Sequence, residues 1–128
     1  MNEQEFITAY PVSDTEIRIG AHKVAMLMSV SEKTRREISG LRGFGDGEVS
    51  AMYETEADYE LTIERVMTHD RLRFSRKILY PVVLISGEKT VTYGSCECVS
   101  IETVRKVGEP PVERVTIKAG TREEVINE

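Results

Sequence analysis

The stretch that decides the fold is Tyr59-Glu60-Leu61-Thr62-Ile63-Glu64-Arg65-Val66. Every second residue from Tyr59 to Ile63 is apolar, and the residues between them are polar. Successive side chains of an extended chain point to opposite faces, so this alternation is typical of a strand with one buried face. The stretch therefore predicts a β-strand with an apolar face in a core and a polar face outside it.

The same alternation recurs elsewhere in the chain. It returns at Thr15–Ile19, at Val91–Tyr93 and at Val115–Lys118, and Pro81–Ile85 is an apolar run suited to a buried strand. We expect a mainly β fold of two packed antiparallel sheets, a sandwich or barrel. Helical spacing appears once, at 69–79, where Thr68 or Asp70 could cap a short flanking helix that Pro81 ends.

Residues 24–66 predict one long hairpin. It begins in an apolar segment, Val24–Val30, that is expected to start buried on both faces, and its methionines Met26 and Met28 are expected to be core or adaptable packing residues. Its outer part, 32–48, carries charge on both faces and contains a glycine-rich tip, so it should project from the body. Residues 1–13 read as an N-terminal arm that must dock to be ordered, and 122–128 as a frayed acidic tail. The whole chain, 1–128, is expected to form a single domain.

Composition argues against a general nucleic-acid-binding protein, a membrane-spanning protein and a secreted protein. The 128 residues are 40% hydrophobic and 30% charged, an ordinary balance for a soluble protein, and the net charge of −5 disfavours general nucleic-acid binding. No run approaches the roughly 20 apolar residues of a membrane span. The acidic N-terminus lacks the apolar core of a signal peptide, so we expect folding in a cytosol.

No group of residues predicts catalysis, a metal or a cofactor. His22 and His69 lie at a turn and at a predicted helix start, and neither has a nucleophile and an orienting group in an evident pattern. Cys96 and Cys98 share one face of a strand, which does not suit a disulfide between them, so we interpret them as reduced structural thiols. The sequence predicts a protein that is not an enzyme.

Three blocks in order resemble the tail-tube proteins of bacteriophages and related contractile injection systems. Residues 3–48 are similar to the family's arm, hairpin and charged extension, 49–66 to the strand that returns from it, and 90–122 to its last three strands. The resemblance spans nearly the whole chain and implies two packed sheets with one helix. It also implies subunits that form rings, usually hexameric, which stack into a hollow tube. The abbreviated helix region departs from typical tube subunits and leaves a baseplate or tube-initiating ring protein open.

The resemblance assigns roles to particular side chains. The outer face of the opening strand, Glu60, Thr62 and Glu64, is expected to line a lumen or meet a neighbouring subunit. The charged extension is expected to contact adjacent subunits through Glu32, Lys33, Arg35, Arg36, Glu37, Arg42 and Phe44.

The expected partners are other copies of this chain, with sheath, baseplate and tape-measure proteins. The expected place is the tail of a virion or phage-like particle assembled in the cytoplasm of a bacterial host. DNA or effectors would pass through the lumen without sequence-specific binding. A monomeric β-barrel that binds a ligand or peptide stays as an alternative from another class, with a pocket along Val24–Val30 or Val82–Ile85.

Overall fold

A computed structural model describes residues 2–42, 49–54, 58–67, 74, 76–78 and 80–126, with side chains omitted for 2–4, 36–42 and 49–54. The described chain is almost entirely β-structure, which confirms the predicted fold class. Its elements are β1 (Asn2–Tyr10), a 3-10 turn η1 (Val12–Asp14), β2 (Thr15–Ile19), β3 (His22–Lys23), β4 (Leu27–Arg42), β5 (Val49–Glu54), β6 (Asp58–Val66), β7 (Val82–Ser86), β8 (Lys89–Val104) and β9 (Val112–Ile126).

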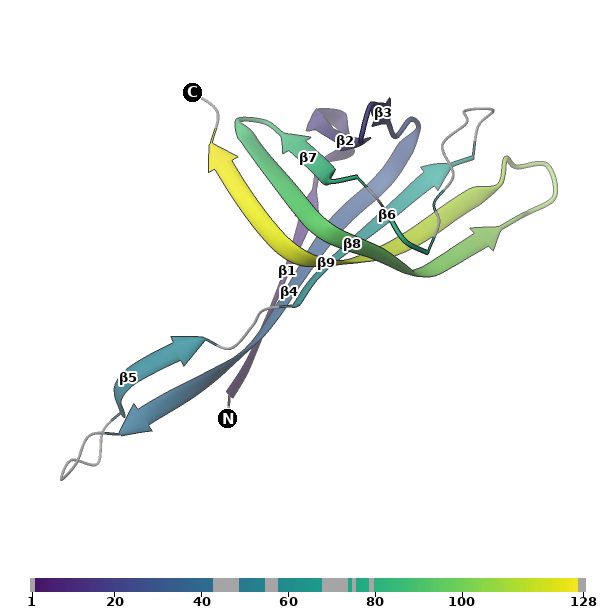
Figure 1. Ribbon diagram of the computed structural model, residues 1–128. Helices are drawn as coiled ribbons and strands as arrows, with labels where there is room; N and C mark the ends of the chain where they lie inside the picture. The colour runs from purple at the N-terminus through teal and green to yellow at the C-terminus, as the bar shows by residue number, and fades with distance from the viewer. Residues whose placement is uncertain are drawn as a thin grey trace.

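All strands belong to one antiparallel sheet that curls around the core (Figure 1). The order is β1-β4-β6-β9-β8-β7-β2-β3, and β5 pairs with the outer part of β4. The long strands β8 and β9 connect two layers. Residues Val112–Ala119 of β9 pair with β6, whereas Lys89–Tyr93 of β8 pair with β7. The two predicted sheets are therefore two halves of one continuous sheet in a sandwich-like arrangement.

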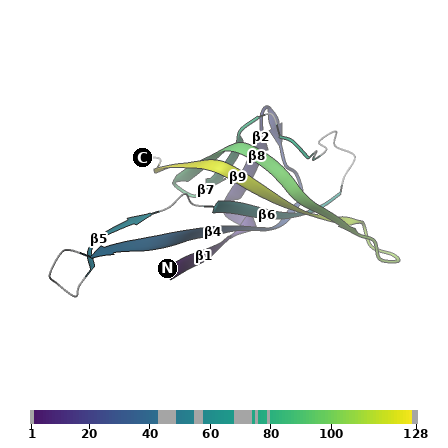
Figure 2. The same ribbon diagram turned by 60° about the horizontal axis from the view of Figure 1, so that its bottom comes forward.

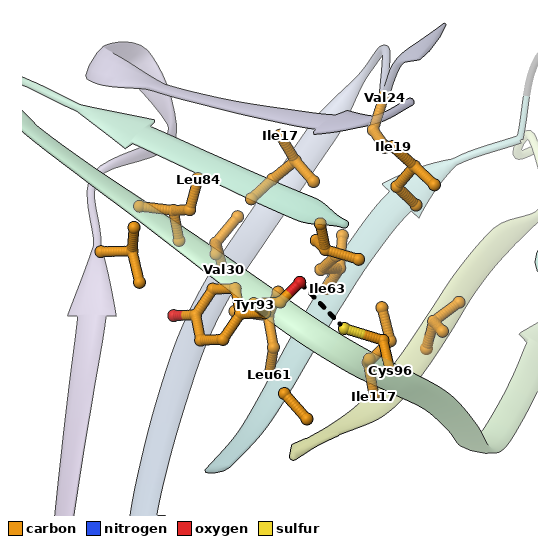
Figure 3. Close-up of a cluster of buried hydrophobic side chains, with 14 of the residues drawn as sticks. Ile17, Ile19, Val24, Val30, Leu61, Ile63, Leu84, Tyr93, Cys96 and Ile117 are labelled. Carbon is orange, nitrogen blue, oxygen red and sulfur yellow. Dashed lines mark hydrogen bonds between the residues drawn. The ribbon is translucent and has the colours of Figure 1, made fainter. Parts of the chain in front are cut away.

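The core lies between these halves (Figure 3). Ile17 of β2 and Leu84 of β7 face Val30 of β4 and Ile63 of β6, and the Tyr93 ring lies among them. Ile17, Ile63 and Leu84 are completely buried. Ile17 and Ile63 come from segments with the predicted alternation, and Leu84 comes from the predicted apolar run, so both patterns place the core correctly. Val82 and Leu84 are likewise packed inside, where the ligand-binding alternative required a pocket.

The long hairpin is confirmed and projects from the body (Figures 1 and 2). Strand β4 pairs with β6 from Leu27 to Arg35 and with β5 from Ile38 to Arg42. We call the paired segments Ile38–Arg42 and Val49–Glu54 the projection. Strand β1 docks along β4, from Asn2 opposite Ile38 to Tyr10 opposite Val30, so most of the predicted arm is an edge strand.

The predicted flanking helix is wrong in the described part of 69–79. Arg76–Ile78 are extended, and Lys77 forms an antiparallel bridge with Glu97. The Ile78 amide donates to the Cys96 carbonyl at 3.2 Å. Strand β7 begins at Val82, opposite Tyr93, so the part of β8 beyond Tyr93 has no β7 partner, and this segment pairs with backbone groups there. Residues 68–73, 75 and 79 lie outside the described residues.

Two further expectations are wrong. Met26 and Met28 are 58% and 47% exposed, because Met26 has a positive φ and the register shifts between Leu27 and Ser29, which breaks the alternation. Arg122–Ile126, expected to be frayed, completes β9 and pairs with Lys89–Tyr93 of β8.

Candidate assembly surfaces

Strands β4, β6, β9 and β8 turn a continuous polar surface away from the core. Residues opposite each other on antiparallel neighbours share a face, so the registers connect side chains across all four strands. We call this surface the polar face; it consists of Ser31 and Lys33, Glu60, Thr62 and Glu64, Arg114, Thr116 and Lys118, and Glu97, Ser100 and Glu102.

Charges alternate in sign across the polar face. Along one row, Lys33 lies opposite Glu60, Glu60 opposite Lys118, and Lys118 opposite Glu97. Opposite charges facing each other across strands stabilise the pairing, typically by about 0.2–1 kcal/mol. The surface is thus of mixed charge and largely compensates itself.

A second row repeats this alternation nearer the loop that joins β8 to β9. Arg114 forms an ion pair with Glu64, with 3.6 Å between Nε and Oε1, and Arg114 also lies opposite Glu102. Glu60, Thr62 and Glu64, predicted to line a lumen or an interface, all lie half-buried on the polar face. The cations beside them, Lys118 and Arg114, come from β9 and are not indicated by the sequence of β6 alone.

The predicted contact residues of the extension divide between two sides of β4. Lys33 and Arg35 point to the outer side, where both approach the Glu5 carboxylate of β1, at 3.4 and 3.6 Å. Glu32 points inward and is only 5% exposed. Arg36, Glu37 and Arg42 lie in β4 with undescribed side chains, and Phe44 lies outside the described residues.

Glu32 belongs to a buried polar cluster that sequence reasoning missed. The Tyr93 hydroxyl donates a hydrogen bond to the Glu32 carboxylate. Arg122 forms an ion pair with the same carboxylate, with 3.0 Å between its Nε and Glu32 Oε1. Burial and the bond to Glu32 raise the pKa of Tyr93, so this hydroxyl keeps its proton. The cluster connects the part of β4 that precedes the projection to the last residues of β9.

The cluster continues to the surface through Lys89. The Lys89 ammonium lies 2.7 Å from Glu124, 3.4 Å from the Tyr10 hydroxyl and 5.4 Å from the Tyr10 ring centroid. The bond from Lys89 lowers the pKa of Glu124 below its ordinary value. Arg122 also lies 3.2 Å from Glu124, so the network joins Tyr10 at the end of β1 and Glu32 of β4 to β8 and β9.

A second buried ion pair lies between β6 and β9. Arg65 donates to Glu113 at 3.0 Å, with side chains 3% and 8% exposed, and its guanidinium lies 5.0 Å from the Phe74 ring centroid. The sequence does carry a signal for both buried sites. Glu32, Arg65 and Glu113 each occur in phase with the buried residues of their strands, at the spacing of two from Val30, Ile63 and Val115.

The two cysteines and one of the two histidines lie among the described residues. Cys96 and Cys98 are free and buried, as predicted, and burial raises the pKa of Cys98 to about 11, which keeps it a poorly reactive thiol. His22 is exposed in β3, and His69 lies outside the described residues. Among the residues that the structure describes, no group of acidic, His or Cys side chains could hold a metal ion.

A hollow of about 300 Å³ lies against the loop that joins β8 to β9. Its apolar wall contains Met28, Val104, Pro110 and Val112. Three carboxylates and two cations complete the lining, namely Glu64, Glu102, Glu109, Lys106 and Arg114. We call this hollow the end pocket. It adjoins the polar face at the row that contains Glu64, Arg114 and Glu102.

No known protein family and no curated protein matches the sequence. The fold, in contrast, matches chains in structures of two kinds of particle. A chain of the gene transfer agent virion superposes with a TM-score of 0.65 and 11% identity, covering 91% of this chain and 99% of that one.

Two further matches come from the anti-feeding prophage. A chain in the structure of its tube-terminating cap gives a TM-score of 0.64 with 12% identity and covers 91% of both chains. A chain in the structure of its baseplate gives 0.56 with 15% identity and covers 87% of this chain and 90% of that one. The protein therefore has a fold that also occurs in a gene transfer agent virion and in the baseplate and tube-terminating cap of the anti-feeding prophage. Within the described residues, no helix is long and apolar enough to cross a membrane.

Proposed function

We propose that this protein is a structural subunit of a phage or phage-like tail tube, and that it forms rings, hexameric by resemblance, which stack into a hollow conduit. The observation that carries the proposal is the match over about nine-tenths of the chain to components of two tail-like particles. The matched chains come from particle structures, which supports a structural role without enzymatic activity.

The shape of the subunit supports assembly. The projection is a two-stranded ribbon, and isolated ribbons are marginally stable in water at best. Strand β1 also presents an edge along its whole length, since its only partner in the sheet is β4 among the described strands. Exposed edges favour pairing with other chains, and a closed ring is one way to satisfy them. Contacts between copies would stabilise both features.

The polar face is our candidate for the wall of the lumen. It is a broad sheet surface whose side chains remain hydrophilic while the opposite side forms the core. Its compensated charges would allow DNA or an effector to pass without strong retention, because tight polyanion binding requires a concentrated positive surface. Lys33, Arg35, Arg36, Glu37, Arg42 and Phe44 remain proposed contacts between subunits, and Glu32 would act by holding β4 in place.

A second candidate is a ring protein of the same fold that starts or ends a tube. Two of the matched structures are a baseplate and a tube-terminating cap, which favours this reading specifically. In both cases the proposed partners are sheath, baseplate and tape-measure proteins, in a particle assembled in the bacterial cytoplasm.

Negative-stain microscopy and light scattering of the purified protein test the proposal. We expect rings, or tubes at high concentration. The number of copies per purified particle separates the two candidates, since a tube subunit occurs in many stacked rings and an initiator or cap in one. A protein that stays monomeric at all concentrations, also with its neighbouring gene products, would contradict both and favour a monomeric binding module.

A further inference from the structure

Strand β1 is held by few side chains. Its only partner in the sheet is β4 among the described strands, and the backbone pairs run from Asn2 to Tyr10. Of the described side chains of β1, only Tyr10 is buried, whereas Phe6 and Ile7 are 51% and 68% exposed. Elements with few buried apolar contacts open at a lower free-energy cost than the core does. We therefore expect β1 to open without the rest of the body, and Tyr10 to be the side chain that opposes this opening.

Lys89 of β8 holds Tyr10 from the other half of the sheet. The Lys89 ammonium donates to the Tyr10 hydroxyl at 3.4 Å and lies 5.4 Å from the centroid of the Tyr10 ring. Lys89 occurs in phase with the buried residues Val91 and Tyr93, so its side chain is on the core side of β8. A cation on that side requires a partner, and the Glu124 carboxylate of β9 lies 2.7 Å from it. We call Tyr10, Lys89 and Glu124 the Lys89 bridge.

The end of β9 fixes the position of Lys89, although β9 does not pair with β1. Glu124 binds both Lys89 and Arg122, and Arg122 also pairs with the buried Glu32 of β4. The bond between Lys89 and Glu124 raises the pKa of the ammonium and lowers the pKa of the carboxylate, so both groups are charged at neutral pH. The Lys89 bridge therefore connects β1 to a strand with which it shares no backbone pair.

We propose that the Lys89 bridge is a conformational device that couples the docking of β1 to the order of the end of β9. While Glu124 holds Lys89, Tyr10 keeps its partner and β1 is the edge strand of the sheet. When Lys89 leaves Tyr10, β1 opens, and the backbone groups of β4 that paired with it become the edge. Strand β1 is thus the two-state element, and the end of β9 is the site that biases it. The device is a property of a single subunit, so it does not depend on the proposed assembly.

Amide hydrogen exchange, measured by NMR for single residues of the full chain, tests the coupling. Lys89→Met keeps an apolar side chain but removes the charge, and it should accelerate exchange of the β1 amides about tenfold, because a hydrogen bond and a cation–π contact are lost. Glu124→Gln changes a residue of β9, which does not pair with β1, and it should accelerate the same amides about threefold, the effect of losing a partly exposed ion pair. The amides of Ile63 and Ile117 should exchange as in wild type, which would show that the core stays closed.

The matched control is Lys23→Met. Lys23 also pairs with a carboxylate, Glu16 at 3.2 Å, but it lies in β3, which does not pair with β1, so this variant should leave β1 unchanged. A variant that combines Lys89→Met and Glu124→Gln should exchange no faster than Lys89→Met alone, because Glu124 acts through Lys89.

Four outcomes would overturn the proposal. Two are wild-type exchange of the β1 amides in Lys89→Met or in Glu124→Gln, and equal acceleration of these amides in Lys23→Met. A third is an effect of about thirtyfold in the combined variant, since the two substitutions would then act independently. The fourth is equal acceleration of the β1 and Ile63 amides, because β1 would then open only with the whole fold.

Discussion

The body and the projection of this protein are stabilised differently. Ile17, Ile63 and Leu84 of the body are completely buried in a core that joins most strands of the sheet. The projection consists of Ile38–Arg42 of β4 paired with β5. The body should therefore determine whether the chain folds, and the projection should determine what the folded chain contacts. The predictions below test this division, beginning with the largest expected effect.

Ile63→Asp should unfold the subunit. The side chain is completely buried, and an unpaired carboxylate there would destabilise the fold by more than about 4 kcal/mol. Urea titration monitored by circular dichroism measures the change. Val107→Asp, at a fully exposed site, is the control and should remain within about 0.5 kcal/mol of wild type. A cooperative, wild-type-like transition for Ile63→Asp would show that the core is misplaced.

Glu32→Ala should cost about 3 kcal/mol, because Arg122 and the Tyr93 hydroxyl lose their buried partner. The neighbouring Lys33→Ala removes only a partly exposed ion pair with Glu5 and should cost less than about 1 kcal/mol. The two adjacent substitutions thus compare the inner and outer sides of one strand. Equal effects in urea titration would contradict the inward placement of Glu32.

Alkaline pH should weaken the body. The pKa of Cys98 rises from about 9 to about 11 on folding because the thiol is buried, so the folded state retains a proton that the unfolded state loses. Stability is therefore complete below pH 9 and declines as pH rises towards 11, by about 2 kcal/mol from this group. Urea midpoints across this range measure the decline, which should be shallower in Cys98→Ala. A decline of equal slope in both proteins would exclude this thiol as a cause.

Replacing both Arg35 and Arg36 with Glu should hardly change stability. Arg35 is about half exposed and pairs with Glu5 at 3.6 Å, and exposed ion pairs contribute little. Assembly should nevertheless be impaired, because negative charges at these two positions, just before the projection, would repel a neighbouring surface that is complementary to arginine. Light scattering measures assembly and urea titration measures the fold. Loss of the fold with these substitutions would contradict the division between body and projection.

The alternation of side chains allowed most of the fold to be predicted. It identified Thr15–Ile19 and the inward set of β9, because each buried face needs apolar residues at every second position, and the continuous apolar run identified Pro81–Ile85. It failed where the backbone departs from that period, at Met26 and the bulge after Leu27. It also failed at Arg76–Ile78, where pairing with β8 overrides the helical spacing.

The candidate surfaces were only partly predictable. Glu60 and Glu64 were assigned to an outer face correctly, but their cationic neighbours Lys118 and Arg114 come from β9, and strand register is not visible in one sequence. Glu32 was assigned to an exposed charged run, although its phase with Val30 placed it inside. The end pocket combines the bulged Met28 with the β8–β9 loop, a juxtaposition that only tertiary structure reveals.

The rows of the polar face also constrain how such a chain can evolve. Lys118 lies between Glu60 on one strand and Glu97 on the other, so reversing its charge alone would place three like charges in a line. We therefore expect related sequences to exchange these charges in groups, with a reversal on β9 accompanied by reversals on β6 or β8. The signature of this sheet in distant relatives would be correlated changes of sign across strands, and the identity of any single residue would be a weaker guide.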